Sequence, residues 1–274
     1  MKEIKINVRN FVEKFESGLE SIIYYYSDPI YYSDIVLYKR FRSVEFIKNY
    51  NSNVSFNMLN NKYEKILMIP TLNCFKDEIK VLDVGIERDK FLGYTMRKSN
   101  LKPIKASHKL SEDGSYKLIY YKPNNTELSF EDKIKYLKLL REKIEKFNNM
   151  DVYIGDFNYE NFLVSDDMDK MVLCDLDNLK IWSHDFDNKT ISVQKYEEMC
   201  MSNKFNNLEG LDSFCFNIFT LSLLLDQSNF TTLRNINNIV LPEEFDNFEN
   251  NNILESIKKL DKSYKPRFLI DKFR

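Results

Sequence analysis

The chain has 274 residues, of which 43% are hydrophobic and 30% charged, and its net charge is −2. This composition is typical of a folded, soluble protein, and it gives no reason to expect nucleic acid or an anionic membrane as a partner. Its four cysteines are not at CxxC spacing and it has only two histidines, which excludes the common zinc patterns and a disulfide framework. We therefore expect a cytoplasmic protein, with no signal peptide in its charged N-terminus and no apolar run long enough to cross a bilayer.

The first third of the chain predicts a strand-rich lobe with one helix. Short runs rich in Ile, Val and Tyr are separated by turn residues, which is typical of a strand meander. The expected strands are 3–8, 21–26, 30–32, 35–40, 79–84 and 90–96, and the expected helices are 10–19 and 54–68.

After Arg97 the pattern becomes mainly helical. Ser129 is a favourable helix N-cap, and apolar residues recur every three or four positions over 130–148, which predicts an amphipathic helix. Residues 211–225 are apolar on all sides and predict a buried helix. Other expected pieces are short apolar stretches among polar loops, at 152–154, 162–164 and 171–174, and a last helix over 253–260.

One constellation of polar residues suggests chemistry. Asp156 and Asn161 are five positions apart in a loop, and Asp175 follows a short apolar strand. Carboxylate and amide oxygens are the hard ligands that Mg²⁺ takes alongside phosphate oxygens, and a separate carboxylate can accept the proton of a hydroxyl. The spacing therefore suits phosphoryl transfer.

This constellation resembles the catalytic centre of the protein kinase superfamily. The family's His-Arg-Asp-x-x-x-x-Asn loop corresponds to Ile154-Gly155-Asp156 through Asn161, and its Asp-Phe-Gly corresponds to Asp175-Leu176-Asp177. The resemblance implies that Asp156 is the catalytic base and that Asn161 and Asp175 hold Mg²⁺. Asp177 is either a second metal ligand or a solvated turn residue.

Further matches extend the resemblance over the whole chain. Val36-Leu37-Tyr38-Lys39 is similar to the family's Val-Ala-Ile-Lys strand, so Lys39 is expected to bind the ATP phosphates, unless it is an ordinary solvated lysine. Glu64 is the candidate ion-pair partner of Lys39, and Asp212 is expected to accept hydrogen bonds from the catalytic-loop backbone. The expected nucleotide contacts are the strand residues Tyr94, Thr95 and Met96, with Leu163 under the adenine. Cys174 is expected either to face the nucleotide beside the metal-binding Asp175 or to be a small buried hydrophobic residue.

The chain also departs from the family pattern. No glycine stands at Tyr25–Tyr32, where we place the glycine-rich loop, and Gly155 replaces the usual Arg. Gly155-Asp156 is similar to the His-Gly-Asp loop of aminoglycoside and choline phosphotransferases, which share the fold.

The resemblance implies an α+β, two-lobed fold of a divergent bacterial or phage type. Its small antiparallel-sheet lobe spans residues 1–97 and its mainly helical lobe spans 98–274. The leading expectation is an ATP- and Mg²⁺-dependent transfer of the γ-phosphate to a hydroxyl of a protein. The alternatives are a small-molecule hydroxyl as the acceptor, or a pseudokinase that binds partners without catalysis.

Overall fold

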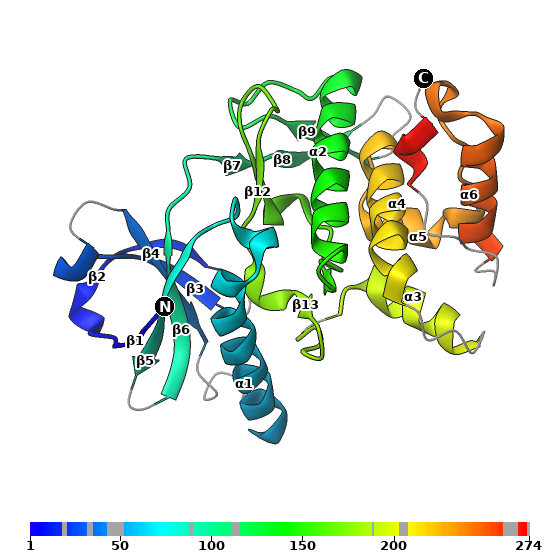
Figure 1. Ribbon diagram of the computed structural model, residues 1–274. Helices are drawn as coiled ribbons and strands as arrows, with labels where there is room; N and C mark the ends of the chain where they lie inside the picture. Colours follow the sequence, from blue (N-terminus) through cyan, green and yellow to red (C-terminus); the bar gives the residue numbers. More distant parts are fainter. Residues whose placement is uncertain are drawn as a thin grey trace. The chain divides into compact units, whose positions relative to one another are not determined.

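The structure is a computed structural model, and the description covers residues 1–17, 21–31, 35–42, 52–87, 90–110, 116–187, 189–202, 208–259 and 268–272. These parts form a mixed α+β structure with six α-helices and a six-stranded, largely antiparallel sheet (Figure 1). The predicted α+β class is confirmed. None of the described helices has both the length and the apolar character needed to cross a membrane.

The chain divides into two compact units. The first consists of Met1–Asn100 and Leu173–Asp187, and the second of Leu101–Val172 and Asn188–Arg274. The sequence-based boundary at residue 97 assigned everything after it to one lobe, whereas the structure assigns the fifteen-residue stretch 173–187 to the first unit. We call this stretch the returning segment.

The first unit contains the six-stranded sheet, in the order β1-β5-β6-β4-β3-β2. Only the pair β1–β5 is parallel. Helix α1 packs against β5 and β6 and also against the returning segment, within which Leu176–Asn178 forms one 3₁₀ turn. The sheet and helix bounds are β1 (Glu3–Lys5), β2 (Phe11–Ser17), β3 (Ser21–Tyr26), β4 (Val36–Phe41), β5 (Val81–Glu87), β6 (Lys90–Arg97) and α1 (Ser52–Met68).

Two expectations for this unit are wrong. The helix expected over 10–19 is strand β2, which pairs with β3 along its length. Phe11, Val12 and Phe15 have helix-like spacing, but Phe11 stacks on Tyr24 across the strand pair with ring centroids 4.7 Å apart. Cross-strand packing therefore overrides the local pattern. The strand expected over 30–32 is not formed at Ile30 and Tyr31, which belong to the 3₁₀ turn Pro29–Tyr31, and Tyr32 lies outside the described residues.

Tyr25 and Tyr26, at the start of the stretch where we expected the glycine-rich loop, end β3, and Pro29–Tyr31 forms a 3₁₀ turn on the way to β4. Strands β3 and β4 pair as an antiparallel hairpin, with Tyr26 opposite Val36. Together with neighbouring apolar residues, this stretch lines a surface hollow of about 580 Å³. The loop of the β2–β3 hairpin is residues 18–20, which lie outside the described residues.

The second unit is mainly helical. Helix α2 has the predicted bounds and begins with a capping box between Ser129 and Asp132. Helix α4 is buried over nearly its whole length and contacts α2, α3 and α5. The helices are α2 (Phe130–Asn148), α3 (Ile191–Ser202), α4 (Leu211–Leu224), α5 (Asn229–Arg234) and α6 (Phe248–Lys259).

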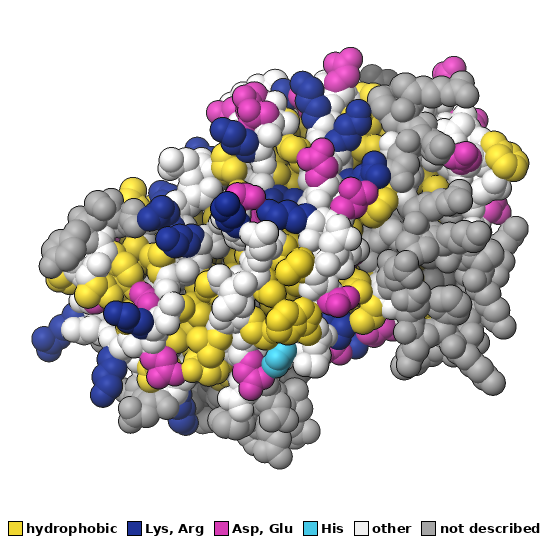
Figure 2. Space-filling model, viewed as in Figure 1, with side chains coloured by type: hydrophobic (Ala, Val, Ile, Leu, Met, Phe, Trp, Pro, Cys, Tyr) yellow, Lys and Arg dark blue, Asp and Glu magenta, His cyan; other side chains and the backbone are white. Residues whose placement is uncertain are grey.

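Short strands complete the second unit. Strands β12 (Met171–Leu173), β11 (Phe162–Val164) and β7 (Lys102–Pro103) form a small sheet in that order. A two-stranded hairpin, β8 (Lys105–Leu110) with β9 (Tyr116–Tyr121), was not predicted. Strand β10 (Val152–Tyr153) leads into the loop that carries Asp156. On the described part of the face shown in Figure 2, both acidic and basic side chains are present.

Candidate functional site

Lys39 lies in the middle of the sheet of the first unit. Strand β4 runs between β3 and β6, so its backbone is paired on both sides, with Lys39 opposite Ile23 and Tyr94. The ammonium Nζ donates to Asp175 Oδ1 and to Asp177 Oδ1, each at 2.5 Å. Burial lowers the pKa of Lys39, but the charges of Asp175 and Asp177 outweigh it and hold the pKa well above its usual value. Lys39 is therefore a fixed positive charge.

Asp177 is a deeply buried carboxylate of this cluster, with a side chain only 2% exposed. Its Oδ1 accepts from Lys39 and from the Tyr94 hydroxyl at 2.9 Å, and its Oδ2 accepts from Lys62 at 2.7 Å. Burial alone would raise the pKa of Asp177, yet the two lysines hold it well below its usual value. A buried ionised carboxylate is stable only when it is paired in this way.

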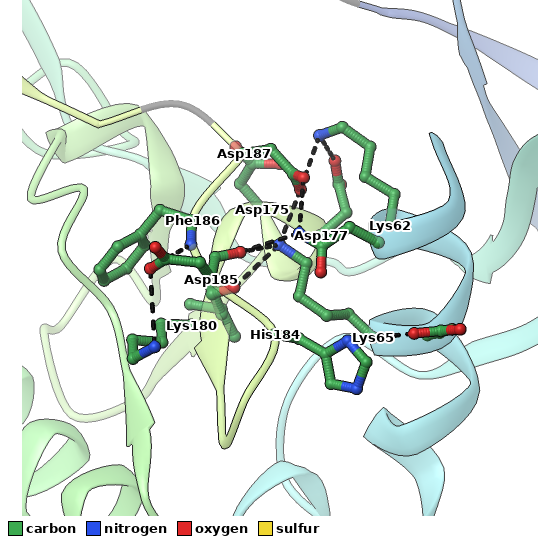
Figure 3. A network of polar contacts seen from close by, with 12 residues as sticks. Lys62, Lys65, Asp175, Asp177, Lys180, His184, Asp185, Phe186 and Asp187 are labelled. Carbon is green, nitrogen blue, oxygen red and sulfur yellow. Dashed lines mark hydrogen bonds and ion pairs between the residues drawn. The ribbon is translucent and has the colours of Figure 1, made fainter. Parts of the chain in front are cut away.

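Helix α1 contributes two buried lysines to the same network (Figure 3). Lys62 reaches Asp177, and Lys65 donates to Asp187 Oδ2 at 2.7 Å and to the backbone carbonyls of Leu179 and Asp185. All of these acceptors belong to the returning segment. The lysines therefore attach this segment to the helix through charged hydrogen bonds.

These lysines were missed at the sequence level, although a signal was present. Leu59, Lys62, Ile66 and Ile69 share one face of the helical pattern, and that face is turned inward. Lysine is rarely fully buried unless it is paired. A lysine within an apolar helix face therefore indicates an acidic partner elsewhere in the chain.

Glu64 does not take the expected place beside Lys39. Its Oε2 lies 3.2 Å from His184 Nδ1, and its side chain is more than half exposed. Glu64 is two positions from Lys62 and one from Lys65, so it points away from the face that both lysines share. The anions that face Lys39 come instead from the returning segment.

In the second unit, Asp212 holds the backbone of the loop that carries Asp156 and Asn161. The carboxylate of Asp212, at the start of α4, accepts hydrogen bonds from the backbone N–H groups of Ile154 and Gly155 at 2.9–3.1 Å. These are the hydrogen bonds that the resemblance led us to expect. Burial raises the pKa of Asp212 to about 7, against the lowering effect of the two N–H donors.

The loop itself brings Asp156 and Asn161 together. Asn161 Nδ2 donates to Asp156 Oδ2 at 3.0 Å, and residues 159–161 form one 3₁₀ turn. Gly155 has a φ of 63°, a conformation that strains any residue with a Cβ. The carbonyl of Gly155 accepts from the Thr190 hydroxyl at 3.1 Å, so the backbone before Asp156 is fixed on both sides.

The expected nucleotide contacts lie on β6, on β11 and directly after β12. Tyr94, Thr95 and Met96 lie in β6, whose backbone pairs with β4 on one side and with β5 on the other. The backbone N–H and C=O groups of these residues are therefore used within the sheet and are not available to an adenine base. Leu163 is the central, half-buried residue of β11, opposite Pro103. Cys174 precedes Asp175, and burial raises the pKa of its thiol to about 12.

The candidate metal ligands differ in their fit to Mg²⁺. Asp175 has a side chain 28% exposed, and only its Oδ1 takes part in a hydrogen bond to the described residues. Asp177 does not fit the expected metal role, because both of its oxygens accept hydrogen bonds from lysines. Among the described residues, no three His, Cys, Asp or Glu side chains are grouped to hold an ion. Asp175 therefore has an oxygen available to a metal, and Asp177 does not.

Comparisons with known proteins do not extend these observations. No protein-family model matches this sequence, and no curated protein is significantly similar to it.

Proposed function

We propose that this chain is an ATP- and Mg²⁺-dependent phosphotransferase with a two-lobed, protein-kinase-like fold. In this reading the first unit is the nucleotide-handling lobe and the second unit carries the catalytic loop. The proposal is supported by the order of the elements: a lysine strand, a helix and two strands, followed by a loop with Asp156 and Asn161, a hairpin ending before Asp175, and a buried helix headed by Asp212.

The observation that carries the proposal is the contact between Lys39 and Asp175. These residues are 136 positions apart, yet the lysine Nζ and the carboxylate Oδ1 are 2.5 Å apart within one compact unit. A fixed ammonium beside a carboxylate with one available oxygen suits a metal–phosphate ligand, because the lysine can bind phosphate oxygens while the carboxylate binds the metal.

The remaining donor capacity of Lys39 agrees with this role. An ammonium has three N–H donors, and among the described residues the Nζ of Lys39 meets two carboxylate acceptors. One donor is left for a phosphate oxygen. Bound Mg²⁺ would neutralise charge on the phosphates, and Asp175 is the residue of the first unit that would hold it.

Asp156 is the proposed base. It accepts the proton of the acceptor hydroxyl as the hydroxyl oxygen bonds to the γ-phosphorus and ADP leaves. Asp212 fixes the backbone on which Asp156 stands, and Asn161 orients its carboxylate. The protein thus acts by positioning and by charge.

One observation favours a small-molecule acceptor as a second candidate. The loop is built on a glycine in the left-handed conformation directly before Asp156, and Gly-Asp is the variant found in the small-molecule phosphotransferases that it resembles. An Arg at this position would be strained. A protein hydroxyl and a small-molecule hydroxyl are therefore both to be tested as acceptors.

A thermal-shift titration with Mg-ATP tests the proposal. We expect ATP with Mg²⁺ to raise the melting temperature of the wild type, and Asp175→Asn to lose most of this shift because a metal ligand is removed. Asp166→Asn, an exposed carboxylate in the turn between β11 and β12, is the matched control and should keep the shift.

The outcomes separate the alternatives. A shift followed by phosphorylation of protein supports a protein kinase, and a shift without it, together with ADP release on adding small alcohols or amino-alcohols, supports the second candidate. If Mg-ATP produces no shift in the wild type, the phosphotransferase proposal is wrong and the pseudokinase alternative is favoured.

A further inference from the structure

The carboxylate of Asp177 bridges two lysines that belong to different elements. Lys39 on β4 donates to its Oδ1. Lys62 on α1 donates to its Oδ2 (Figure 3). Each oxygen therefore faces its own cation, and the Tyr94 hydroxyl adds a neutral donor to Oδ1. The two lysines are connected through one buried anion.

Lys62 lies closest to Asp177 among the carboxylates that it is seen to contact. Its side chain is 1% exposed, its Nζ is 2.7 Å from Asp177 and 3.6 Å from Asp187, and it lies over the Phe41 ring at 5.1 Å from the centroid. The shorter contact is the one to Asp177. Since Asp187 also has Lys65 at 2.7 Å, the closest ionic partner of Lys62 among the described residues is Asp177.

A lysine that handles phosphates needs a fixed anion, because its four-carbon stem is flexible. Helix α1 does not supply that anion, since Glu64 is the one acidic residue between 52 and 68 and it pairs with His184. The helix instead presents a cation, and the anion comes from the returning segment.

From this geometry we infer that Asp177 is the positioning residue of Lys39 and that Lys62 holds Asp177 in place. This relay, Lys39–Asp177–Lys62, rests on the proposed function only in assigning Lys39 to the phosphates. It makes Lys62 necessary for tight nucleotide binding although Lys62 touches no ligand. It also leaves Asp175 as the single carboxylate of the Asp175–Asp177 pair that can bind a metal.

A matched pair of lysine variants tests the relay. Lys62 and Lys65 lie three positions apart on α1, both are fully buried, and both bind the returning segment, but only Lys62 reaches Asp177. We expect Lys62→Met to raise the Kd and KM for Mg-ATP about tenfold, and Lys65→Met to leave both within about twofold of the wild type, measured at 15 °C on folded protein.

Rescue by a conservative change makes the test sharper. Lys62→Arg keeps a cation opposite Asp177 and is expected to restore the Kd to within about threefold of the wild type, which also covers the case that Lys62→Met folds poorly. Equal weakening by Lys62→Met and Lys65→Met would show a merely structural role and overturn the inference. An unchanged Kd in Lys62→Met would overturn it as well.

A second experiment tests the relay without nucleotide. In a double-mutant cycle of urea unfolding, followed by the fluorescence of the sole tryptophan, Trp182, we expect Lys39→Met with Lys62→Met to lose more stability than the two single losses combined. Only the double variant leaves Asp177 without a cation. Lys39→Met with Lys65→Met should be additive.

The nucleotide-binding measurements and the unfolding cycle together distinguish a failure of the proposed function from a failure of the relay. If the wild type binds no Mg-ATP, the proposed function fails, and the relay is decided by the cycle alone. Additive losses for Lys39 and Lys62 would overturn the relay whatever the nucleotide result.

Discussion

Replacing Lys65 by methionine tests how the returning segment is attached to helix α1. Lys65 Nζ donates to Asp187 Oδ2 at 2.7 Å, to the Leu179 carbonyl at 2.9 Å and to the Asp185 carbonyl at 3.1 Å, and its side chain is fully buried. Methionine fills a similar volume but donates nothing. The variant therefore leaves two backbone carbonyls and one carboxylate without this donor.

The expected loss follows from what remains at Asp187. Breaking a buried ion pair by removing one partner costs about 3–5 kcal/mol. Asp187 keeps the amide of Asn61 at 2.8 Å and the more distant Lys62, and burial already lowers the pKa of Lys65, which weakens its charged form. We therefore expect a loss near the lower end of the range, about 3 kcal/mol.

Trp182 provides the assay, because it is the sole tryptophan, lies in the returning segment and is half exposed. A loss of about 3 kcal/mol lowers the urea midpoint by about 1–2 M for a typical denaturant slope. Lys135→Met, an exposed lysine of α2, is the control and should leave the midpoint unchanged. A shift of Lys65→Met no larger than that of the control would refute the view that Lys65 attaches the segment.

Two further changes probe the two units separately. Asp212 has a folded-state pKa of about 7, above the usual carboxyl value. Between about pH 4 and pH 7 the folded state therefore binds one more proton than the unfolded state, and the stability that this proton gives is lost as the pH rises. Relative to Asp212→Asn, the wild type should lose about 1.4 kcal/mol per pH unit in that window, and a difference in melting temperature that stays constant from pH 5 to 7 would contradict the assignment. In Gly93→Ala the new Cβ would lie 2.1 Å from the Lys39 carbonyl oxygen, so β4 and β6 must separate. We expect a loss of about 3 kcal/mol and weaker Mg-ATP binding, and a variant of wild-type stability would show that the strand pair is looser than described.

The sequence predicts the regular parts of the fold well where one pattern dominates. Helix α2 has a clear N-cap and an unbroken apolar stripe, and its predicted bounds agree with the structure. Helix α4 is apolar on every side, and it is buried nearly throughout. In both cases local pattern and tertiary environment agree.

The sequence-based predictions are wrong or incomplete where pairing with a neighbouring strand determines the structure. Residues 11–15 have a helical spacing of apolar side chains, yet they form β2 because a neighbouring strand is available. The β8–β9 hairpin was overlooked although Asp113-Gly114, a strong turn signal, stands between two runs of alternating residues.

The candidate site was predicted in part. Lys39 and Asp175 were named from short motifs, and the structure brings them into contact. Their surroundings were not predictable in the same way, because charge pairing is not encoded by spacing. The choice of Asp177 rather than Glu64 as the partner of Lys39 depends on which helix face is turned inward.

The most direct test of the proposed function compares the wild type with Asp156→Asn in an ADP-release assay under saturating Mg-ATP and an acceptor hydroxyl. Asp156 lies in the loop fixed by Asp212, so the substitution should preserve the fold and the Mg-ATP thermal shift. We predict that the rate of ADP release falls by about 10²–10⁴-fold while the Kd for Mg-ATP stays within about twofold. An Asp156→Asn variant that releases ADP at the wild-type rate would contradict it.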